Sequence, residues 1–413
     1  MKKQTHFFET LLTSLALVAC TTVAAGTLDT NAFDIVEIER TRILKKAEAY
    51  LSEPPRTVTA DRCERSQGGL HDFYSEGDYW WPDPKNPDGA YLRRDGETNP
   101  DLFNAHRNSI VRFSEIIGTL TSAYLITHDE KYAAQAVSHL TSWFVEDETR
   151  MNSSLLYGQA IKGLHSGRSI GIIDTIHLVE VAWGTKLLCA SRSFPAKEQA
   201  KVKAWFREYL TWLNTHEYGK QEKHHPNNHG VCWSLQAATF ADLVGDTDQL
   251  AWIRTQFKTV YLSQMMDREG GFTEELKRTK PYGYSLFVID AMAGVAQFAS
   301  TPEEDLWTFE LPDGRGMKKG MQFIVPYIAD KRCWPYKQDV MYWDEWPVRH
   351  PSLLLAGIHF ERPDYLSLWK KLEADPTTPE VLRNLPLRHP LLWVPKPKTG
   401  LLGSWQTSDS LTE

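Results

Sequence analysis

Residues 104–146, NAHRNSIVRFSEIIGTLTSAYLITHDEKYAAQAVSHLTSWFVE, decide the fold class of this chain. Apolar side chains recur in the first half of the stretch at intervals of three and four residues, on one face of a helix: Ile110, Phe113, Ile117, Leu120 and Tyr124. The turn Thr127-His128-Asp129 separates this helix from a second one over 130–146. Because the turn is short, the two helices are expected to be antiparallel neighbours.

The same pattern recurs along the chain in adjacent helical pairs: 172–191 with 196–215, 229–244 with 247–267, and 284–299 with 317–329. The pairs share no fixed sequence repeat, so a solenoid is not favoured. Few stretches alternate with the period of a strand. We therefore expect an all-α fold, an α/α toroid (an incomplete α/α barrel) of helical hairpins with a cleft at one end.

The segments outside these pairs complete the expected organisation. Residues 33–51 have a helical pattern, and 52–103 form a long loop region rich in Pro, Gly, Asp and aromatic residues, which we expect to cover the cleft. The Pro-rich stretch from residue 376 onward is expected to wrap the surface, with 403–413 as a disordered tail. Residues 27–402 would then form a single domain.

Composition limits the partners of this 413-residue chain. A formal charge of −7 argues against nucleic acid or an anionic membrane face as the main partner, since both favour a basic surface. An anionic ligand would therefore need a local cationic site. The chain is rich in Trp and Tyr, which either fill a core or lie against sugar rings.

Residues 1–20 have the pattern of an export signal. Lys2 and Lys3 precede an apolar stretch that ends in Leu17-Val18-Ala19-Cys20. This ending resembles the lipobox of bacterial lipoproteins, which implies lipidation of Cys20 and a periplasmic or outer-membrane-anchored protein. The alternative is ordinary cleavage after Ala24 or Ala25. The later cysteines are expected to form no disulfide framework.

Two short segments hold the side chains that could carry chemistry, HHPNNHG at 224–230 and RTKPYGYS at 278–285. Each contains a Pro and a Gly and precedes an apolar helix, so each is expected to be a loop that enters a helix N-terminus. Free N–H groups and the helix dipole favour a carboxylate there. Both segments precede the first helix of a pair, which could place them at the same end of the toroid.

Elimination on a uronic acid needs the residue types found in these segments. The proton beside the sugar carboxylate is poorly acidic, so Asn, Arg and His donors must neutralise that carboxylate. A base then takes the proton and an acid protonates the leaving oxygen, and Tyr can do both. Its pKa of about 10 must fall for it to act as a base, and neighbouring Arg and His⁺ are expected to lower it.

At these residues the chain resembles the alginate lyase family of polysaccharide lyases, including its glucuronan- and mannuronan-cleaving relatives. The matching elements span about residues 70–290: Asn-Asn-His at 227–229, Arg278 with Tyr284 six positions on, DYWWPDP at 78–84, DGETNP at 95–100, and NAHR at 104–107. The resemblance implies an α/α toroid that cleaves a 1,4-linked polyuronate by metal-independent β-elimination, without a cofactor. Its partner would be an acidic polysaccharide or oligosaccharide.

The resemblance also implies roles for individual residues. Tyr284 would be the catalytic acid and base, and His229 would share proton transfer or orient the sugar. Asn228 and Arg278 would neutralise the carboxylate. Tyr282 lies two residues before Tyr284 and either ring could face the cleft, although Tyr284 is favoured because it begins the helix.

Further residues are candidates for substrate binding. Tyr79, Trp80 and Trp81 could form a sugar-stacking wall, or pack as the loop's own small core. His106 and Arg107 open a helix and could contact substrate, or serve only as capping and surface residues. The remaining candidates are cations or helix-start residues: Arg168, Lys280, Asn227 and Tyr282. Asn227 or Asn228 could instead be a simple N-cap.

Two other functions remain open on the sequence. A glycoside hydrolase would need a pair of carboxylates, available among Asp72, Asp78, Asp174, Glu274 and Glu275. A non-catalytic glycan-binding lipoprotein would need only the aromatic and cationic side chains. Zinc is not favoured, because Pro226 interrupts the His225–His229 spacing and no carboxylate stands at ligand spacing. The sequence does not distinguish the uronate, endo from exo action, or the oligomeric state.

Overall fold

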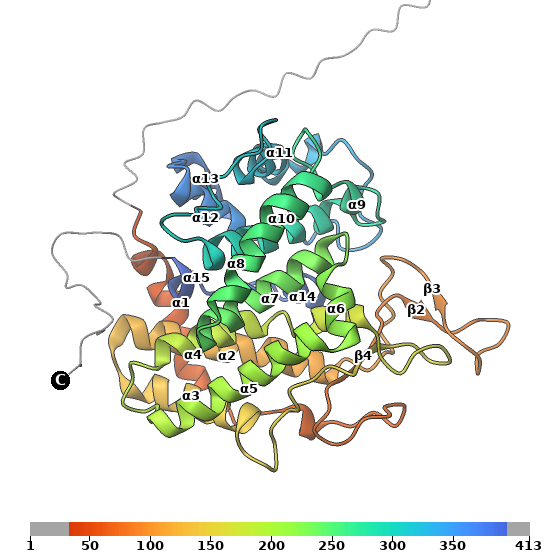
Figure 1. Cartoon of the computed structure of the whole chain (residues 1–413), viewed down its shortest axis with the longest axis vertical. Helices are drawn as coiled ribbons and strands as arrows, with labels where there is room; N and C mark the ends of the chain where they lie inside the picture. Colours follow the sequence, from red (N-terminus) through yellow and green to blue (C-terminus); the bar gives the residue numbers. More distant parts are fainter. Residues whose placement is uncertain (1–32, 395–413) are drawn as a thin grey trace, which may run out of the picture.

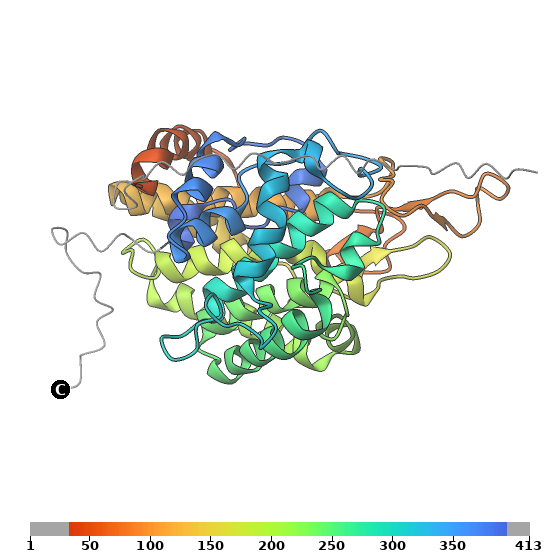
Figure 2. The same ribbon diagram turned by 90° about the horizontal axis from the view of Figure 1, so that it is seen from above.

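The computed structural model describes residues 33–394 (Figures 1 and 2). The predicted signal segment 1–20 with Cys20, and the predicted tail 403–413, lie outside this range and stay predictions, as does the domain range 27–402. None of the helices in the described range is both long enough and apolar enough to span a membrane.

A ring of inner helices forms the centre of the fold, each contacting the next: α2 (Ala105–Thr127), α4 (Leu178–Leu188), α7 (Asn228–Val244), α10 (Pro281–Ala299) and α12 (Pro351–His359). Outer helices pack against them: α1 (Ile35–Tyr50), α3 (Glu130–Phe144), α5 (Ala196–Thr215), α8 (Thr247–Gln256), α11 (Met317–Ala329) and α13 (Pro363–Lys371). The inner α7 and α10 are buried around nearly their whole circumference, whereas the outer α3 and α13 bury one stripe. The predicted α/α toroid is confirmed.

Short elements complete the chain. The remaining helices are α6 (Glu217–Lys223), α9 (Thr273–Leu276), α14 (Pro379–Arg383) and α15 (Pro390–Trp393), with 3-10 turns η2 (Val58–Ala60), η3 (Ser169–Thr175) and η5 (Lys331–Cys333) and a π-helical stretch η4 (Phe257–Met265). β1 (Tyr74–Glu76) pairs in parallel with β4 (Tyr157–Ala160), and β2 (Trp80–Trp81) pairs antiparallel with β3 (Leu92–Arg93). The β2–β3 hairpin projects from one side of the helical body (Figures 1 and 2).

The predicted hairpins agree with the structure where local signals are strong. The segments 196–215 and 317–329 have the bounds of α5 and α11. The segment 172–191 begins as the 3-10 turn η3, and 247–267 changes from α8 to the π-helical η4. Helix α10 begins three residues before the predicted 284, so Tyr284 lies within its first turn.

The described part of the C-terminal segment, residues 376–394, does not wrap the surface, so for these residues the prediction is wrong. Its apolar side chains are buried: Leu385, Leu387, Leu392 and Trp393. His389 lies between α2 and α4, with its ring nitrogens 3.1 Å from the Thr119 hydroxyl and 2.6 Å from the Glu180 carboxylate. The segment therefore fills the inside of the ring. α15 also contacts α1, so the two ends of the described chain meet (Figure 1).

Candidate active site

Tyr284 lies in the first turn of α10. Pro281 at N1 has a fixed φ suited to a helix start. The Asp339 carboxylate accepts the next two backbone N–H groups, at 2.9 and 2.8 Å, and burial raises the pKa of Asp339 to about 6. The Tyr284 hydroxyl lies 2.8 Å from the Tyr79 hydroxyl and accepts a hydrogen bond of 3.3 Å from Arg278. The start of the helix thus holds Tyr284 against the two side chains.

Tyr282 and Tyr284 point in different directions, because two residues are about 200° apart around a helix. Tyr282 is fully buried, and its hydroxyl donates to the carbonyl of Tyr327 at 3.0 Å. Its ring packs on Trp334 and Trp343. Only Tyr284 of the two hydrogen-bonds with Arg278.

The start of α7 holds Asn228 and His229. Asn227 is the N-cap, and its side chain accepts from the His229 N–H at 3.1 Å, so the predicted capping role is present. Asn228 is buried and donates to Glu275 from its backbone N–H and its side-chain amide, at 2.8 and 3.3 Å. Its Oδ1 is buried with no hydrogen-bond partner among the described residues. The ring of His229 is partly exposed, and its Nδ1 lies 2.5 Å from Glu222 Oε1.

Glu275 joins the two helix starts into one site. It lies on the short helix α9, and its carboxylate interacts electrostatically with both Arg278 and His229 while it binds Asn228. Burial raises the pKa of Glu275, although these neighbours act in the opposite direction. Glu275 therefore links the predicted guanidinium, imidazole and amide, and the guanidinium of Arg278 in turn donates to the phenol of Tyr284.

The positive charge of Arg278 is already paired with a carboxylate of the protein. It forms a bidentate pair with Asp95, at 3.1 and 3.0 Å, and the hydroxyl of Thr279 donates to the same carboxylate at 3.0 Å. Burial alone would raise the pKa of Asp95, but these hydrogen bonds and the charge of Arg278 lower it to about 2. Asp95 comes from the long loop region, so this pair fixes the loop over the Arg278–Tyr284 contact.

Burial, not its cationic neighbour, determines the pKa of Tyr284. Burial raises this pKa well above its usual value, Tyr79 and Glu380 raise it further, and Arg278 only partly offsets them. Arg278 acts on the pKa of Tyr284 in the predicted direction, but the expectation that this pKa would fall is wrong, because burial outweighs the cation. The side chain is a protonated phenol, which suits a proton donor.

Lys280 and Tyr79 belong to a buried cluster beside Tyr284. The Lys280 ammonium forms an ion pair with Glu380 and lies 5.0 Å from the centre of the Tyr79 ring. Lys280 is only 3% exposed. Glu380 also lines a cavity of about 780 Å³, together with Arg107, Tyr342 and Arg383. Lys280 and Glu380 therefore lie beside the Tyr79 ring, whose hydroxyl contacts Tyr284.

The two tryptophans of β2 are half-buried on the hairpin. Trp81 donates to the carbonyl of Glu97 at 3.0 Å, and the guanidinium of Arg94 lies 5.0 Å from the centre of its indole. The guanidinium of Arg168 lies 5.8 Å from the centre of the Trp80 ring. Arg168 itself donates to the Gln159 carbonyl and side chain at 2.8 and 3.1 Å, and burial lowers its pKa to about 10. These contacts hold the hairpin together.

His106 and Arg107 hold the loop against the start of α2. The backbone N–H of Tyr74 donates to Nδ1 of His106 at 2.9 Å, and Nε2 of His106 lies 2.9 Å from the Asp61 carbonyl, so both ring nitrogens are occupied. Arg107 donates twice to the buried Asp78, at 2.8 and 2.6 Å. The structure favours a structural role for both residues over substrate contact.

The carboxylates considered for hydrolysis are tied to their own neighbours. Asp78 accepts hydrogen bonds from Arg107, and Glu274 forms an ion pair with Lys277. Asp174 accepts hydrogen bonds from Ser75 and Gln159. Asp72 accepts hydrogen bonds from Gly69 and Asn152. Burial raises the pKa of Glu275, and its carboxylate binds Asn228. A hydrolytic pair needs an acid and a second carboxylate across one bond, and these contacts do not provide it.

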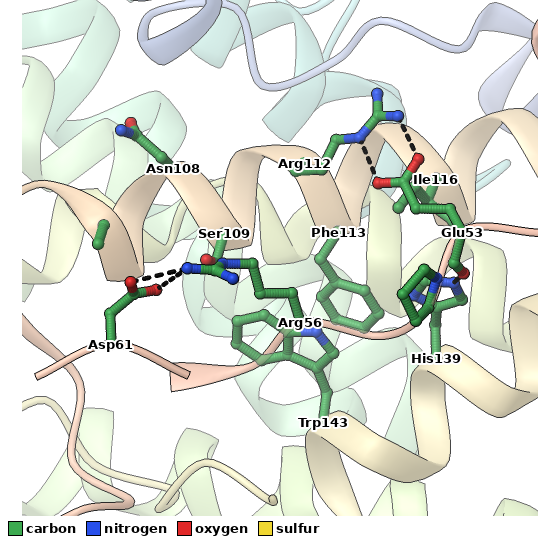
Figure 3. A pocket seen from close by; sticks show the side chains of 12 residues that line it. Glu53, Arg56, Asp61, Asn108, Ser109, Arg112, Phe113, Ile116, His139 and Trp143 are labelled. Carbon is green, nitrogen blue, oxygen red and sulfur yellow. Dashed lines mark hydrogen bonds and ion pairs between the residues drawn. The ribbon is translucent and has the colours of Figure 1, made fainter. Parts of the chain in front are cut away.

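A metal site or a second cavity could also bind a ligand. Within residues 33–394, no group of three or more His, Cys, Asp or Glu could hold a metal ion. A separate cavity of about 310 Å³ lies beside α2 and α3, where Arg112 pairs with Glu53 and Arg56 pairs with Asp61 (Figure 3). Neither Tyr284 nor His229 lines it.

Sequence reasoning missed the partners of the predicted residues. Glu222 and Glu380 were not singled out, Asp95 was noted only within a motif, and Glu275 was considered only for hydrolysis. Asp95 pairs with a side chain 183 positions away, and Glu380 with Lys280 100 positions away. No local pattern indicates such contacts.

An α/α toroid with Arg278 and Tyr284 at one helix start and Asn228 and His229 at another has the fold and the residue types of a polysaccharide lyase. The family model described as alginate lyase matches residues 57–334. An alginate lyase from Bacteroides ovatus is 31% identical, with 86% of this chain and 93% of that chain covered and a TM-score of 0.75. The chain belongs to the alginate lyase family.

More distant structures share the fold. Alginate lyase A1-III from Sphingomonas species A1 is 14% identical, with 87% of this chain and 94% of that chain covered and a TM-score of 0.51. A variant of alginate lyase A1-III complexed with a tetrasaccharide is also 14% identical, with 87% and 93% covered and a TM-score of 0.53. No curated protein sequence matches the chain.

Proposed function

We propose that this lyase cleaves a 1,4-linked polyuronate of the alginate type by β-elimination at the Tyr284 site. The observation that supports the proposal best is the Tyr284 hydroxyl, which accepts from Arg278 in the first turn of α10 while Glu275 links Arg278 to Asn228 and His229. The solved structures named above, which resemble this chain, are alginate lyases, and the structure of one of them contains a tetrasaccharide.

Neutralisation of the sugar carboxylate is the first requirement of the reaction. Arg278 and the start of α7 provide positive charge, and Asn228 and His229 provide polar groups beside it. The carboxylate of the sugar competes with Asp95 for Arg278 when it binds. Stabilising the carboxylate in this way makes the neighbouring C5 proton more acidic.

Proton transfer completes the reaction. Tyr284 is a protonated phenol and gives its proton to the oxygen that leaves C4. The C5 proton passes to a base beside it, the C4–O bond breaks, and a double bond forms between C4 and C5. His229 is the neighbouring group with a second ring nitrogen available for this step.

Ultraviolet absorbance of the new double bond tests the proposal. The purified protein is assayed on polymannuronate, polyguluronate, glucuronan and a neutral glucan, and activity is expected on at least one polyuronate and not on the glucan. Tyr284→Phe is expected to lower kcat by at least about 100-fold, since a general acid contributes about 10²- to 10⁴-fold, and largely to keep binding of an oligouronate. Tyr282→Phe is the matched control, because its hydroxyl contacts only the chain interior.

The outcomes separate the possible functions. New reducing ends without absorbance would indicate hydrolysis, and binding without turnover would indicate a glycan-binding protein. Full activity of Tyr284→Phe would refute the assignment of Tyr284.

A further inference from the structure

Glu222 forms the closest polar contact of His229. It lies in the last turn of α6, and its side chain is 1% exposed. Its Oε1 is 2.5 Å from Nδ1 of His229, across the loop that joins α6 to α7. The Glu222 carboxylate makes no ion pair with a Lys or Arg among residues 33–394, and its Oε2 is buried without a hydrogen-bond partner there.

This contact determines which nitrogen of His229 carries the proton. An ionised carboxylate only accepts hydrogen bonds, so beside an ionised Glu222 the protonated nitrogen of the neutral His229 ring is Nδ1. Nε2 then holds a free lone pair. An imidazole in this state can take up a proton at Nε2 but cannot donate one from it.

We propose that Glu222 is a positioning residue that fixes His229 as the base for the C5 proton. This inference rests on the proposed polyuronate elimination and specifies how its proton steps are divided. A carboxylate hydrogen-bonded to Nδ1 orients the ring and stabilises the imidazolium that forms when Nε2 is protonated. A buried carboxylate oxygen without a partner is unfavourable for stability, and groups of this kind are common where function requires them.

His229 takes up one proton in the reaction and Tyr284 gives up one. The C5 proton moves to Nε2 of His229 and gives an imidazolium, while the phenol proton of Tyr284 moves to the leaving oxygen. The C4–O bond breaks and the C4–C5 double bond forms. The imidazolium then loses one proton and the phenolate gains one through solvent, which restores both side chains.

Several charged groups surround His229 and contribute to its behaviour. The ring of His225 lies 5.0 Å from it, Glu275 interacts with it electrostatically, and Arg278 acts on both of these groups. Glu222 also lies within electrostatic range of Arg168. Within the described part of the chain, Glu222 alone is hydrogen-bonded to the imidazole, so its removal is the specific test.

Glu222→Gln is the test variant, and Glu217→Gln on the exposed side of the same helix is the control. We expect Glu222→Gln to lower kcat at least about tenfold with little change in KM, since carboxylates that orient functional histidines contribute between about 10- and 10⁴-fold. The acidic limb of kcat against pH should move to lower pH, because the imidazolium loses the negative charge that stabilises it. A purely structural role would lower activity equally at all pH values and leave the limb in place, which would overturn the inference.

A second measurement decides the question in the unmodified protein. The ¹⁵N spectrum of the histidines, with the His229 signals assigned by comparison with His229→Gln, should show Nδ1 protonated and Nε2 bare at neutral pH. The opposite tautomer would overturn the inference even where Glu222→Gln does not fold. Loss of activity in Tyr284→Phe together with an unchanged pH profile in Glu222→Gln would reject the role of Glu222 alone, whereas full activity of Tyr284→Phe would reject the proposed function itself.

Discussion

Asp78→Asn is predicted to destabilise the protein strongly and in a pH-dependent way. Asp78 is 3% exposed and accepts two hydrogen bonds from Arg107, at 2.8 and 2.6 Å, while Arg383 approaches it to 3.0 Å. It immediately precedes Tyr79, so it ties the loop that carries Tyr79 to both α2 and α14. The amide of Asn would remove the carboxylate that two buried guanidinium groups share, leaving Arg107 only the carboxylate of Asp174 at 3.6 Å and Arg383 only that of Glu380 at 3.2 Å among the described residues.

The size of the effect follows from the pKa of Asp78. Burial would raise this pKa, but the charges of Arg107 and Arg383 lower it from 3.8 to about 2. At about 1.4 kcal/mol for each pH unit, this shift corresponds to about 2 to 3 kcal/mol of stability. Removal of one partner of a buried pair usually costs about 3 to 5 kcal/mol, because the remaining charges are left uncompensated. We expect a loss between about 2 and 5 kcal/mol in the free energy of unfolding.

The pH dependence gives the prediction a second readout. Because the folded-state pKa of Asp78 lies below its unfolded value, the stabilisation is fully present above about pH 4 and is lost as the pH falls towards 2. Urea unfolding of both proteins at neutral pH and at several values down to pH 2 measures the difference. Asp88→Asn, on the exposed hairpin, is the control and should change stability by less than about 0.5 kcal/mol. A loss below about 1 kcal/mol at neutral pH, or a loss that does not shrink in acid, would refute this reasoning.

Two further substitutions test the loop and the scaffold. Asp95→Asn should lower kcat about tenfold, because it weakens the bidentate contact that holds Arg278 against Tyr284, the proposed proton donor. Steady-state kinetics measure this, and an unchanged kcat would contradict it. Gly171→Ala should lower the free energy of unfolding in urea by at least about 2 kcal/mol, because its Cβ would lie 2.4 Å from the backbone of Gly158. At Gly69 the added Cβ would lie 3.7 Å from the Asp72 carboxylate, an ordinary van der Waals distance, so Gly69→Ala is the control and should be nearly neutral.

The helical part of the fold could be predicted because its signal is local. The stripe from Ile110 to Tyr124 and the αL residue Gly245 after α7 are properties of adjacent residues, and both are present in the structure. The C-terminal segment could not be predicted in the same way. Its prolines indicate irregular backbone, but the burial of His389 between Thr119 and Glu180 depends on partners more than 200 positions away.

The sequence alone determined the hairpins, the two helix starts and the residue types that meet there, because capping, periodicity and side-chain chemistry are encoded within a few positions of each other. The tertiary structure decided that Tyr284 and not Tyr282 meets Arg278, that Asp95 and Glu222 bind the predicted cation and imidazole, and that burial raises the pKa of the phenol. These outcomes depend on desolvation and on ion pairs between distant segments. Such interactions exist only once the ring of helices has packed.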